Sequence, residues 1–165
     1  MRLDYVYEND DMQSRLELGL DALMARETGG LRAVYDAWQS HGAGFERPRV
    51  EGISTLFVDV ANDNPAFYRI SNLREPSCGA YLEGKRIAEH PVEALRRDLM
   101  YEYWWVKDEA RPSAYWLRHN FGGLRRSYHR LLLPLCDRAG RVTVVLCASR
   151  HLEAPRGSLG AIPHG

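Results

Sequence analysis

Two runs, Tyr128-His-Arg-Leu-Leu-Leu-Pro-Leu-Cys136 and Arg141-Val-Thr-Val-Val-Leu-Cys-Ala-Ser149, decide the fold of this chain and predict a β-hairpin. The segment between them is Asp137-Arg-Ala-Gly140, a short polar loop that ends in the glycine a positive φ needs. Pro134 cannot donate a hydrogen bond in a ladder, so we expect a bulge there or a nitrogen that faces away from the neighbouring strand. The second run is apolar on both faces, which predicts a central strand or one covered on both sides.

Apolar residues recur at helical spacing in the first 40 residues. One stripe lies within residues 11–27 and a second within 31–40, where the helix stops before Gly42. We interpret the two helices as a cap on a sheet or as a dimerisation arm. The dimer interface that we predict consists of Leu16, Leu20, Leu23 and Met24.

The middle of the chain changes to strand periodicity and then back to a helix. Residues 55–60 and 66–71 flank the turn Asn62-Asp-Asn-Pro65 and predict a second hairpin. A longer helix is expected from about Val92 to Lys107, because Pro91 suits its first turn, Leu95, Leu99 and Val106 recur at helical spacing, and Pro112 ends it. A strand over residues 113–119 follows. The predicted fold is therefore α+β: a five-stranded antiparallel sheet with helices inserted between its second and third strands, preceded by a helical extension.

Bulk composition narrows the class of protein. The chain has 165 residues, 45% hydrophobic and 27% charged, and equal numbers of basic and acidic side chains give a formal net charge of zero. A neutral chain is not expected to attract nucleic acid or an anionic membrane broadly. The alternative is a local basic strip of Arg125 and Arg126 with Arg118, His129 and Arg130 nearby. No apolar run approaches the length of a membrane span and no signal-peptide core is present, so we expect a cytoplasmic protein.

The order of elements resembles the PAS domain, and most closely a subfamily of short, single-domain bacterial PAS proteins. The resemblance covers about residues 31–150. It is carried by Tyr35-Asp-Ala-Trp38, Leu56-Phe-Val-Asp-Val60, Phe67-Tyr-Arg-Ile70, Leu82-Glu-Gly-Lys-Arg-Ile87 and, above all, Tyr128-His-Arg-Leu-Leu-Leu-Pro-Leu135 followed by Arg141-Val. It implies a sensory or protein-interaction module that holds a small ligand, haem, flavin or nothing between the sheet and its helical layer, and that dimerises through flanking helices.

An aromatic cluster on the long helix and the next strand suggests where such a ligand would lie. The ligand-binding residues that we predict are Tyr68, Trp105, Trp116, Arg118 and His119, with the last two orienting the ligand. The alternative is that the aromatic rings simply fill the space between helix and sheet. Trp104 and Trp105 are consecutive, so both cannot face inward on one helix, and one of them should be exposed or at an interface.

The sequence gives little support for haem binding, metal binding or catalysis. His90 precedes Pro91 at the helix start, so a haem-binding sensor is only a minor alternative, and the identity of any cofactor stays unknown. The three cysteines are widely spaced without a Cys-x-x-Cys pair, so no metal site is expected. No catalytic triad order, phosphate loop or His-Glu-x-x-His spacing occurs, so we do not expect an enzyme or a catalytic residue.

The domain organisation follows from these elements. We expect a flexible N-terminus over residues 1–10, the helical extension over 11–44, a PAS-like domain over 45–150 and a flexible tail over 151–165. The predicted function is a signalling module that binds a small ligand or a partner protein, forms a homodimer, and binds neither nucleic acid nor membrane. The alternative is a ligand-free adaptor, and the two hypotheses differ over whether a cavity exists behind Tyr68, Trp105 and Trp116.

Overall fold

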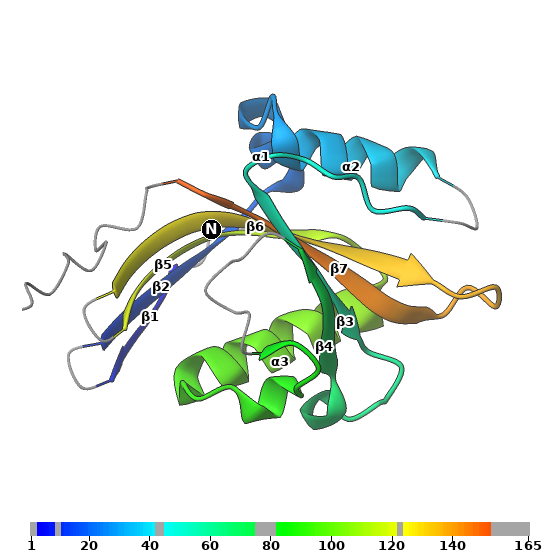
Figure 1. Cartoon of the computed structure of the whole chain (residues 1–165). Helices are drawn as coiled ribbons and strands as arrows, with labels where there is room; N and C mark the ends of the chain where they lie inside the picture. The colour runs from blue at the N-terminus through cyan, green and yellow to red at the C-terminus, as the bar shows by residue number, and fades with distance from the viewer. Residues whose placement is uncertain (1–2, 9–10, 42–44, 75–81, 122–123, 153–165) are drawn as a thin grey trace, which may run out of the picture.

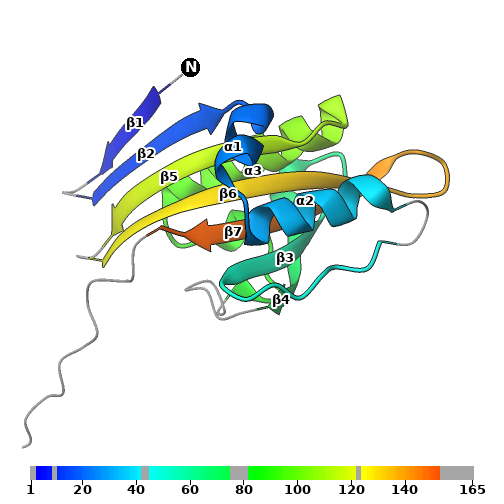
Figure 2. The same cartoon turned by 90° about the horizontal axis from the view of Figure 1, so that it is seen from above.

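A single antiparallel sheet with helices on both faces forms the fold (Figure 1). The computed structural model describes residues 3–8, 11–41, 45–74, 82–121 and 124–152. The sheet has seven strands in the order β1-β2-β5-β6-β7-β3-β4, and Figure 2 shows it from above. Helices α1 and α2 cover one face and α3 covers the other. The coarse prediction of an antiparallel α+β fold is therefore confirmed.

The predicted central hairpin is formed by β6 (Leu124–Cys136) and β7 (Val142–His151). The Asp137 carboxylate accepts the backbone N–H groups of Ala139 and Arg141, and Gly140 has φ +78°, as the loop requires. β7 is a central strand between β6 and β3, and both of its faces are buried, with Val145 and Cys147 in one apolar cluster and Leu146 and Ala148 in the other. Pro134 lies beyond the end of β5, and its carbonyl accepts a hydrogen bond from Trp38 Nε1 at 2.8 Å.

The second hairpin is also present. β3 (Ile53–Asp59) pairs antiparallel with β4 (Arg69–Arg74), and a short 3-10 helix, η1 (Pro65–Phe67), precedes β4. Another 3-10 helix, η3 (Ile87–Glu89), leads to α3. The hairpin forms one end of the sheet, opposite the edge formed by β1.

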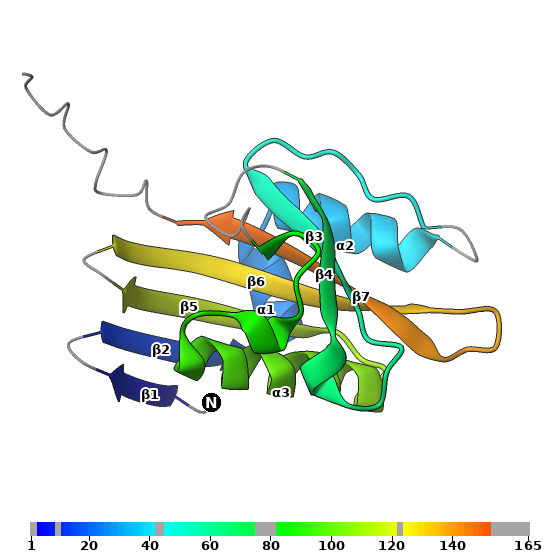
Figure 3. The same cartoon turned by 60° about the horizontal axis from the view of Figure 1, so that its bottom comes forward.

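The long helix α3 (Glu93–Glu109) crosses the lower face of the sheet in Figure 1 and is seen from that side in Figure 3. It ends at Ala110 in the left-handed region, just before Pro112, and β5 (Ser113–Phe121) follows. The core on this face is one apolar cluster. Its members include Val58, Tyr68, Ile70, Ile87, Tyr103, Val106, Tyr115, Leu117, Leu132 and Val145.

A second apolar cluster fills the opposite face under α1 (Leu20–Arg26) and α2 (Gly30–Ser40). It contains Leu23, Met24, Leu31, Val34, Ile53, Ala114, Leu131, Leu133, Leu146 and Ala148. The sheet thus has a core on each side. None of the described helices is long and apolar enough to cross a membrane.

The prediction of one helix over residues 11–27 was wrong. Residues Asp11–Leu18 form β2, which pairs with β5, and only Leu20–Arg26 are helical. The physical reason lies in Arg15-Leu16-Glu17-Leu18, where charged and apolar residues alternate with the period of a strand. This alternation puts Leu16 beside Trp116 and Arg15 beside Leu117 in the register, on opposite faces of the sheet.

The predicted domain boundaries also need correction. Residues Leu3–Glu8, expected to be flexible, form β1 at the edge of the sheet, so the sheet has seven strands rather than five. The helical extension over 11–44 is not separate from the domain, because β2 belongs to the same sheet and α1 and α2 cover it. β7 continues to His151, and residues 153–165 of the predicted tail lie outside the described part of the chain.

Candidate functional site

A buried ionic cluster joins α3 to the sheet. The Glu102 side chain is fully buried, and its carboxylate accepts hydrogen bonds from Arg15 of β2, at 2.9 Å, and from Arg130 of β6. The Tyr115 ring lies beside both guanidinium groups, with centroid distances of 5.5 Å to Arg15 and 5.7 Å to Arg130. The cluster therefore connects three strands with the middle of the long helix.

The charged side chains of this cluster are largely buried. Burial lowers the pKa of Arg130 to about 10, which still leaves the guanidinium charged at neutral pH. Arg130 Nε and Tyr68 Oη are buried without a hydrogen-bond partner in the described part of the chain. Burial also raises the pKa of Tyr68 to about 12, so its hydroxyl stays protonated.

The predicted ligand site does not assemble as expected. Tyr68 is fully buried in the core under α3, and Trp105 packs against the same cluster. Trp116 lies on the other face, beside Leu16 and His129 in the register, so the sheet separates it from Tyr68 and Trp105. Between α3 and the sheet, the space that a ligand would occupy holds buried side chains, among them Tyr68, Tyr103, Leu117 and Leu132.

The two polar residues of the predicted site, Arg118 and His119, come after Trp116 in β5. Arg118 is exposed, and its guanidinium lies 5.9 Å from the centroid of the Trp116 ring. His119 has a described backbone in β5, while its side chain lies outside the described part of the chain. The predicted basic strip is also divided, because consecutive residues of a strand alternate between the faces. Arg118 and His129 share the face of α1, whereas Arg130 faces α3.

A second buried carboxylate lies on that face. Glu27, at the end of α1, is 3% exposed; it accepts a hydrogen bond from His129 Nδ1 at 2.7 Å and two from Arg150 Nε at 2.8 and 2.9 Å. Burial opposes ionisation of Glu27, but the hydrogen bonds from Arg150 and His129 outweigh it and lower the pKa of the carboxyl. This cluster anchors α1 to β6 and β7.

Next to the Glu27 cluster, a hollow of about 690 Å³ opens between α1 and the sheet. It is lined by Leu16, Glu17, Leu18, Gly19, Ala22, Leu23, Arg26, Trp116 and His129. Trp116 Nε1 donates to Ser127 Oγ at 3.0 Å, and Glu27 holds the His129 ring, so two of the walls are fixed.

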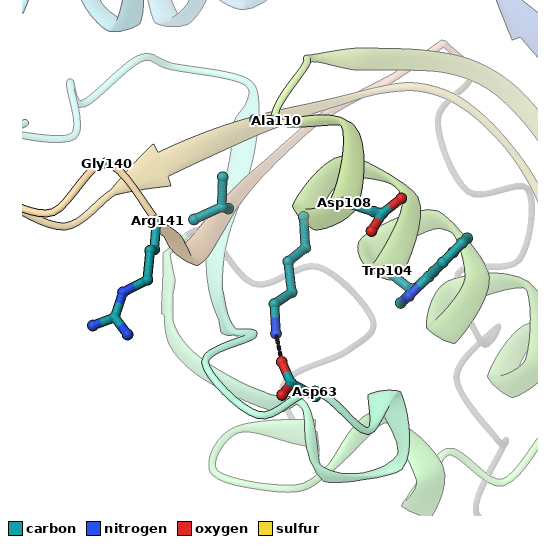
Figure 4. A pocket seen from close by; sticks show the side chains of 8 residues that line it. Asp63, Trp104, Asp108, Ala110, Gly140 and Arg141 are labelled. Atoms are coloured by element: carbon teal, nitrogen blue, oxygen red, sulfur yellow. Dashed lines mark hydrogen bonds and ion pairs between the residues drawn. The ribbon is translucent and has the colours of Figure 1, made fainter.

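The outer face of α3 is a different kind of surface. Trp104 is 39% exposed and Tyr101 is 52% exposed, with ring centroids 6.1 Å apart. Trp105 packs inward, as expected for one member of a consecutive pair. Trp104 borders two hollows, one shared with Tyr101 and Pro65 and one of about 560 Å³ shared with Asp63 and Asp108. Figure 4 shows the second hollow, with Trp104 and Asp108 one turn apart on α3. The Lys107 ammonium pairs with the Asp63 carboxylate there, at 3.0 Å.

Most of the predicted dimer residues are buried in the protein's own core or pack against it. Leu23 and Met24 are 1% and 6% exposed, and Leu20 packs against the same cluster. Leu16 belongs to β2 and lines the hollow beside α1. A dimer through this stripe would therefore have to expose apolar side chains that the sheet now covers.

His90, the candidate haem ligand, is used locally. It is 7% exposed, and its Nδ1 accepts the backbone N–H of Val92 at 3.1 Å, which helps to start α3. Burial lowers its pKa and thus favours the neutral ring. The described residues hold no group of three or more His, Cys, Asp or Glu side chains placed to bind a metal ion together.

Comparisons with known proteins give no identity. No family model, no curated protein and no solved structure matches this chain significantly. The function therefore has to be argued from the geometry.

Two buried glutamates, Glu27 and Glu102, attach helices to opposite faces of the sheet, and the sequence did not predict these roles. Glu102 could have been found, because it lies at helical spacing between Leu95, Leu99 and Val106, where an apolar residue would be expected. A charged residue on an apolar stripe indicates a buried partner of opposite charge. Glu27 carries no comparable pattern, since it lies at the helix end beside Thr28 and two glycines.

Proposed function

We propose that this chain is a PAS-like signalling module that acts through protein contacts, as a homodimer formed by the outer faces of two α3 helices. The PAS interpretation is supported by the part of the sheet ordered β4-β3-β7-β6-β5, in which α3 connects the second strand along the chain to the third and lies over one face. The filled space beneath α3 favours an interaction module over a sensor with a ligand in that place.

The observation that carries the proposal is a self-complementary stripe on α3. Arg97, Tyr101, Trp104 and Asp108 are all exposed and follow one another at helical spacing, with a basic residue at one end and an acidic one at the other. A two-fold axis through the middle of the helix would place Arg97 against the partner's Asp108 and Tyr101 against the partner's Trp104. Both pairs are centred on the same point of α3, between Glu102 and Tyr103.

An isologous contact of this kind meets the requirement that each residue finds its counterpart in both directions. Aromatic side chains at the centre and charged ones at the rim are also typical of stable interfaces. Pro65 and Ala66 border the Tyr101 and Trp104 side chains and extend the apolar surface. One helix stripe buries less area than a standard interface, so we expect a dimer of micromolar affinity.

The experiment is a charge-reversal cycle measured by sedimentation velocity over a concentration series. Arg97→Asp places two acidic side chains together, and Asp108→Arg places two basic ones together, so each single variant should weaken the dimer about tenfold or more. The double variant Arg97→Asp/Asp108→Arg restores the pairing with the charges exchanged and should recover most of the affinity. Rescue by the double variant is specific to an antiparallel arrangement of the two helices.

One control and one further variant make the outcome decisive. Arg49→Asp reverses an exposed arginine between α2 and β3, which lines neither of the hollows that border Trp104, and should leave the association unchanged. Trp104→Ala should weaken it without affecting the fold, because the ring is partly exposed. A monomer at all concentrations, or a dimer insensitive to the reversals at positions 97 and 108, would refute the proposed interface.

A further inference from the structure

We propose that the hollow between α1 and the sheet is a binding site for a small carboxylate with an apolar body, such as an aromatic or short aliphatic acid. Its volume of about 690 Å³ lies within the range of small-molecule sites. The site lies on the face opposite α3 and does not depend on the dimer proposed above.

The hollow offers an apolar surface for the body of such a ligand. Leu16 and Leu18 come from β2, Leu23 comes from α1, and Trp116 contributes a half-buried indole ring. The hydrogen bond from Trp116 Nε1 to Ser127 Oγ fixes this ring in place before any ligand arrives. Preorganised walls of this kind reduce the entropy lost on binding.

The charged side chains around the hollow select an anion. Arg26 lines it, and the Arg118 guanidinium lies over the Trp116 ring. Both arginines are exposed, and neither has an ion-pair partner in the described part of the chain. Glu17 also borders the hollow, but it is paired in register with Tyr115, whose ring belongs to the α3 face, so its side chain points to the other side of the sheet.

His129 supplies a further polar group. The Glu27 carboxylate can only accept, so Nδ1 of His129 carries the proton between them, and the ring's Nε2 is left without a partner among the described residues. Glu27 is itself neutralised by Arg150. The hollow therefore combines apolar walls, the Arg26 guanidinium and one oriented imidazole, with a second guanidinium, that of Arg118, beside its Trp116 wall. Together these groups suit a carboxylate rather than a cation or a neutral apolar molecule.

The test is calorimetric titration of the full chain with phenylacetate and with phenylacetamide, which has the same ring but no charge. We expect phenylacetate to bind and the amide to bind about tenfold more weakly, the difference that a carboxylate–arginine contact supplies. Arg26→Gln and Arg118→Gln should each weaken phenylacetate several-fold and leave the amide unchanged. Ala22→Trp, which fills the hollow from α1, should abolish binding of both.

The matched control is Arg138→Gln, an exposed arginine far from α1 that should have no effect. Both glutamine substitutions at the site are at exposed positions, and circular dichroism checks that the variants fold. Absence of phenylacetate binding up to millimolar concentration, equal affinity for acid and amide, or equal loss in Arg138→Gln would each overturn the assignment. None of these outcomes bears on the charge-reversal cycle at α3, so the two proposals fail separately.

Discussion

His129 and Arg130 are consecutive residues of β6 that hold two buried glutamates on opposite faces of the sheet. His129 contacts Glu27 at the end of α1, while Arg130 contacts Glu102 in the middle of α3. The alternation of side chains along a strand makes this possible with no change in the backbone. One strand therefore anchors the helices of both layers through charged contacts.

The first prediction concerns Glu102. Glu102→Gln removes the buried carboxylate that Arg130 and Arg15 share, and breaking a buried ion pair typically costs about 3–5 kcal/mol. We expect the free energy of unfolding in urea to fall by about this amount. Glu109→Gln, on the exposed end of the same helix, should change it by less than about 0.5 kcal/mol. Equal stability of Glu102→Gln and the parent chain would mean that the two arginines find other partners.

The second prediction is a pH dependence at Glu27. Its pKa is lowered in the folded protein, so the unfolded chain binds the proton more readily. The stability from this group is therefore fully present above the ordinary pKa of 4.5 and is lost as the pH falls through the lower folded value. We expect the difference in unfolding free energy between the parent chain and Glu27→Gln to shrink over that range. Glu51→Gln, at an exposed position, should show no such trend.

Local patterns predicted much of the fold. The hairpin of β6 and β7 followed from two apolar runs around a glycine-ended loop, and α3 followed from its stripe and from the prolines on either side. These elements are specified by nearby residues, so periodicity and turn chemistry suffice to find them. Helix geometry alone also predicted that one of Trp104 and Trp105 is exposed, and the structure shows that it is Trp104.

The errors arose where distant contacts decide the structure. Leu16, Leu20, Leu23 and Met24 fall at helical spacing, yet Leu16 lies in a strand because β5 offers an unpaired edge nearly 100 residues later in the chain. The same cause separated Trp116 from Tyr68 and Trp105. Which face of a strand points toward which helix depends on the register, and local sequence does not reveal it.

The third prediction concerns Tyr68. Its hydroxyl is buried and has no hydrogen-bond partner in the described part of the chain, a state that costs about 1–3 kcal/mol. Tyr68→Phe removes only this oxygen, so the unfolding free energy should stay the same or rise by about 1 kcal/mol. Tyr103→Phe is the contrast, because Tyr103 is equally buried but its hydroxyl contacts the Cys147 thiol. A loss of stability in Tyr68→Phe would reveal a partner for the hydroxyl.

The fourth prediction tests how closely α2 packs on the sheet. A Cβ at Gly30, the first residue of α2, would lie 2.4 Å from Ile53 Cγ1 and 2.7 Å from Ile53 Cδ1. Cγ1 is not a flexible chain end, so the helix or β3 has to move, and overpacking of this kind costs about 1–3 kcal/mol. We therefore expect Gly30→Ala to lower the unfolding free energy by that amount.

Gly19→Ala is the matched control for Gly30→Ala, because Gly19 precedes α1 and a Cβ there would meet only Ala22 Cβ, at 3.9 Å. The cause of the loss is tested by combining Gly30→Ala with Ile53→Ala, which removes both clashing atoms. If the clash is responsible, the double variant should be more stable than the sum of the two single effects predicts, since the residues are in contact. Simple additivity would place the cost of Gly30→Ala elsewhere, in the start of the helix rather than in its packing on β3.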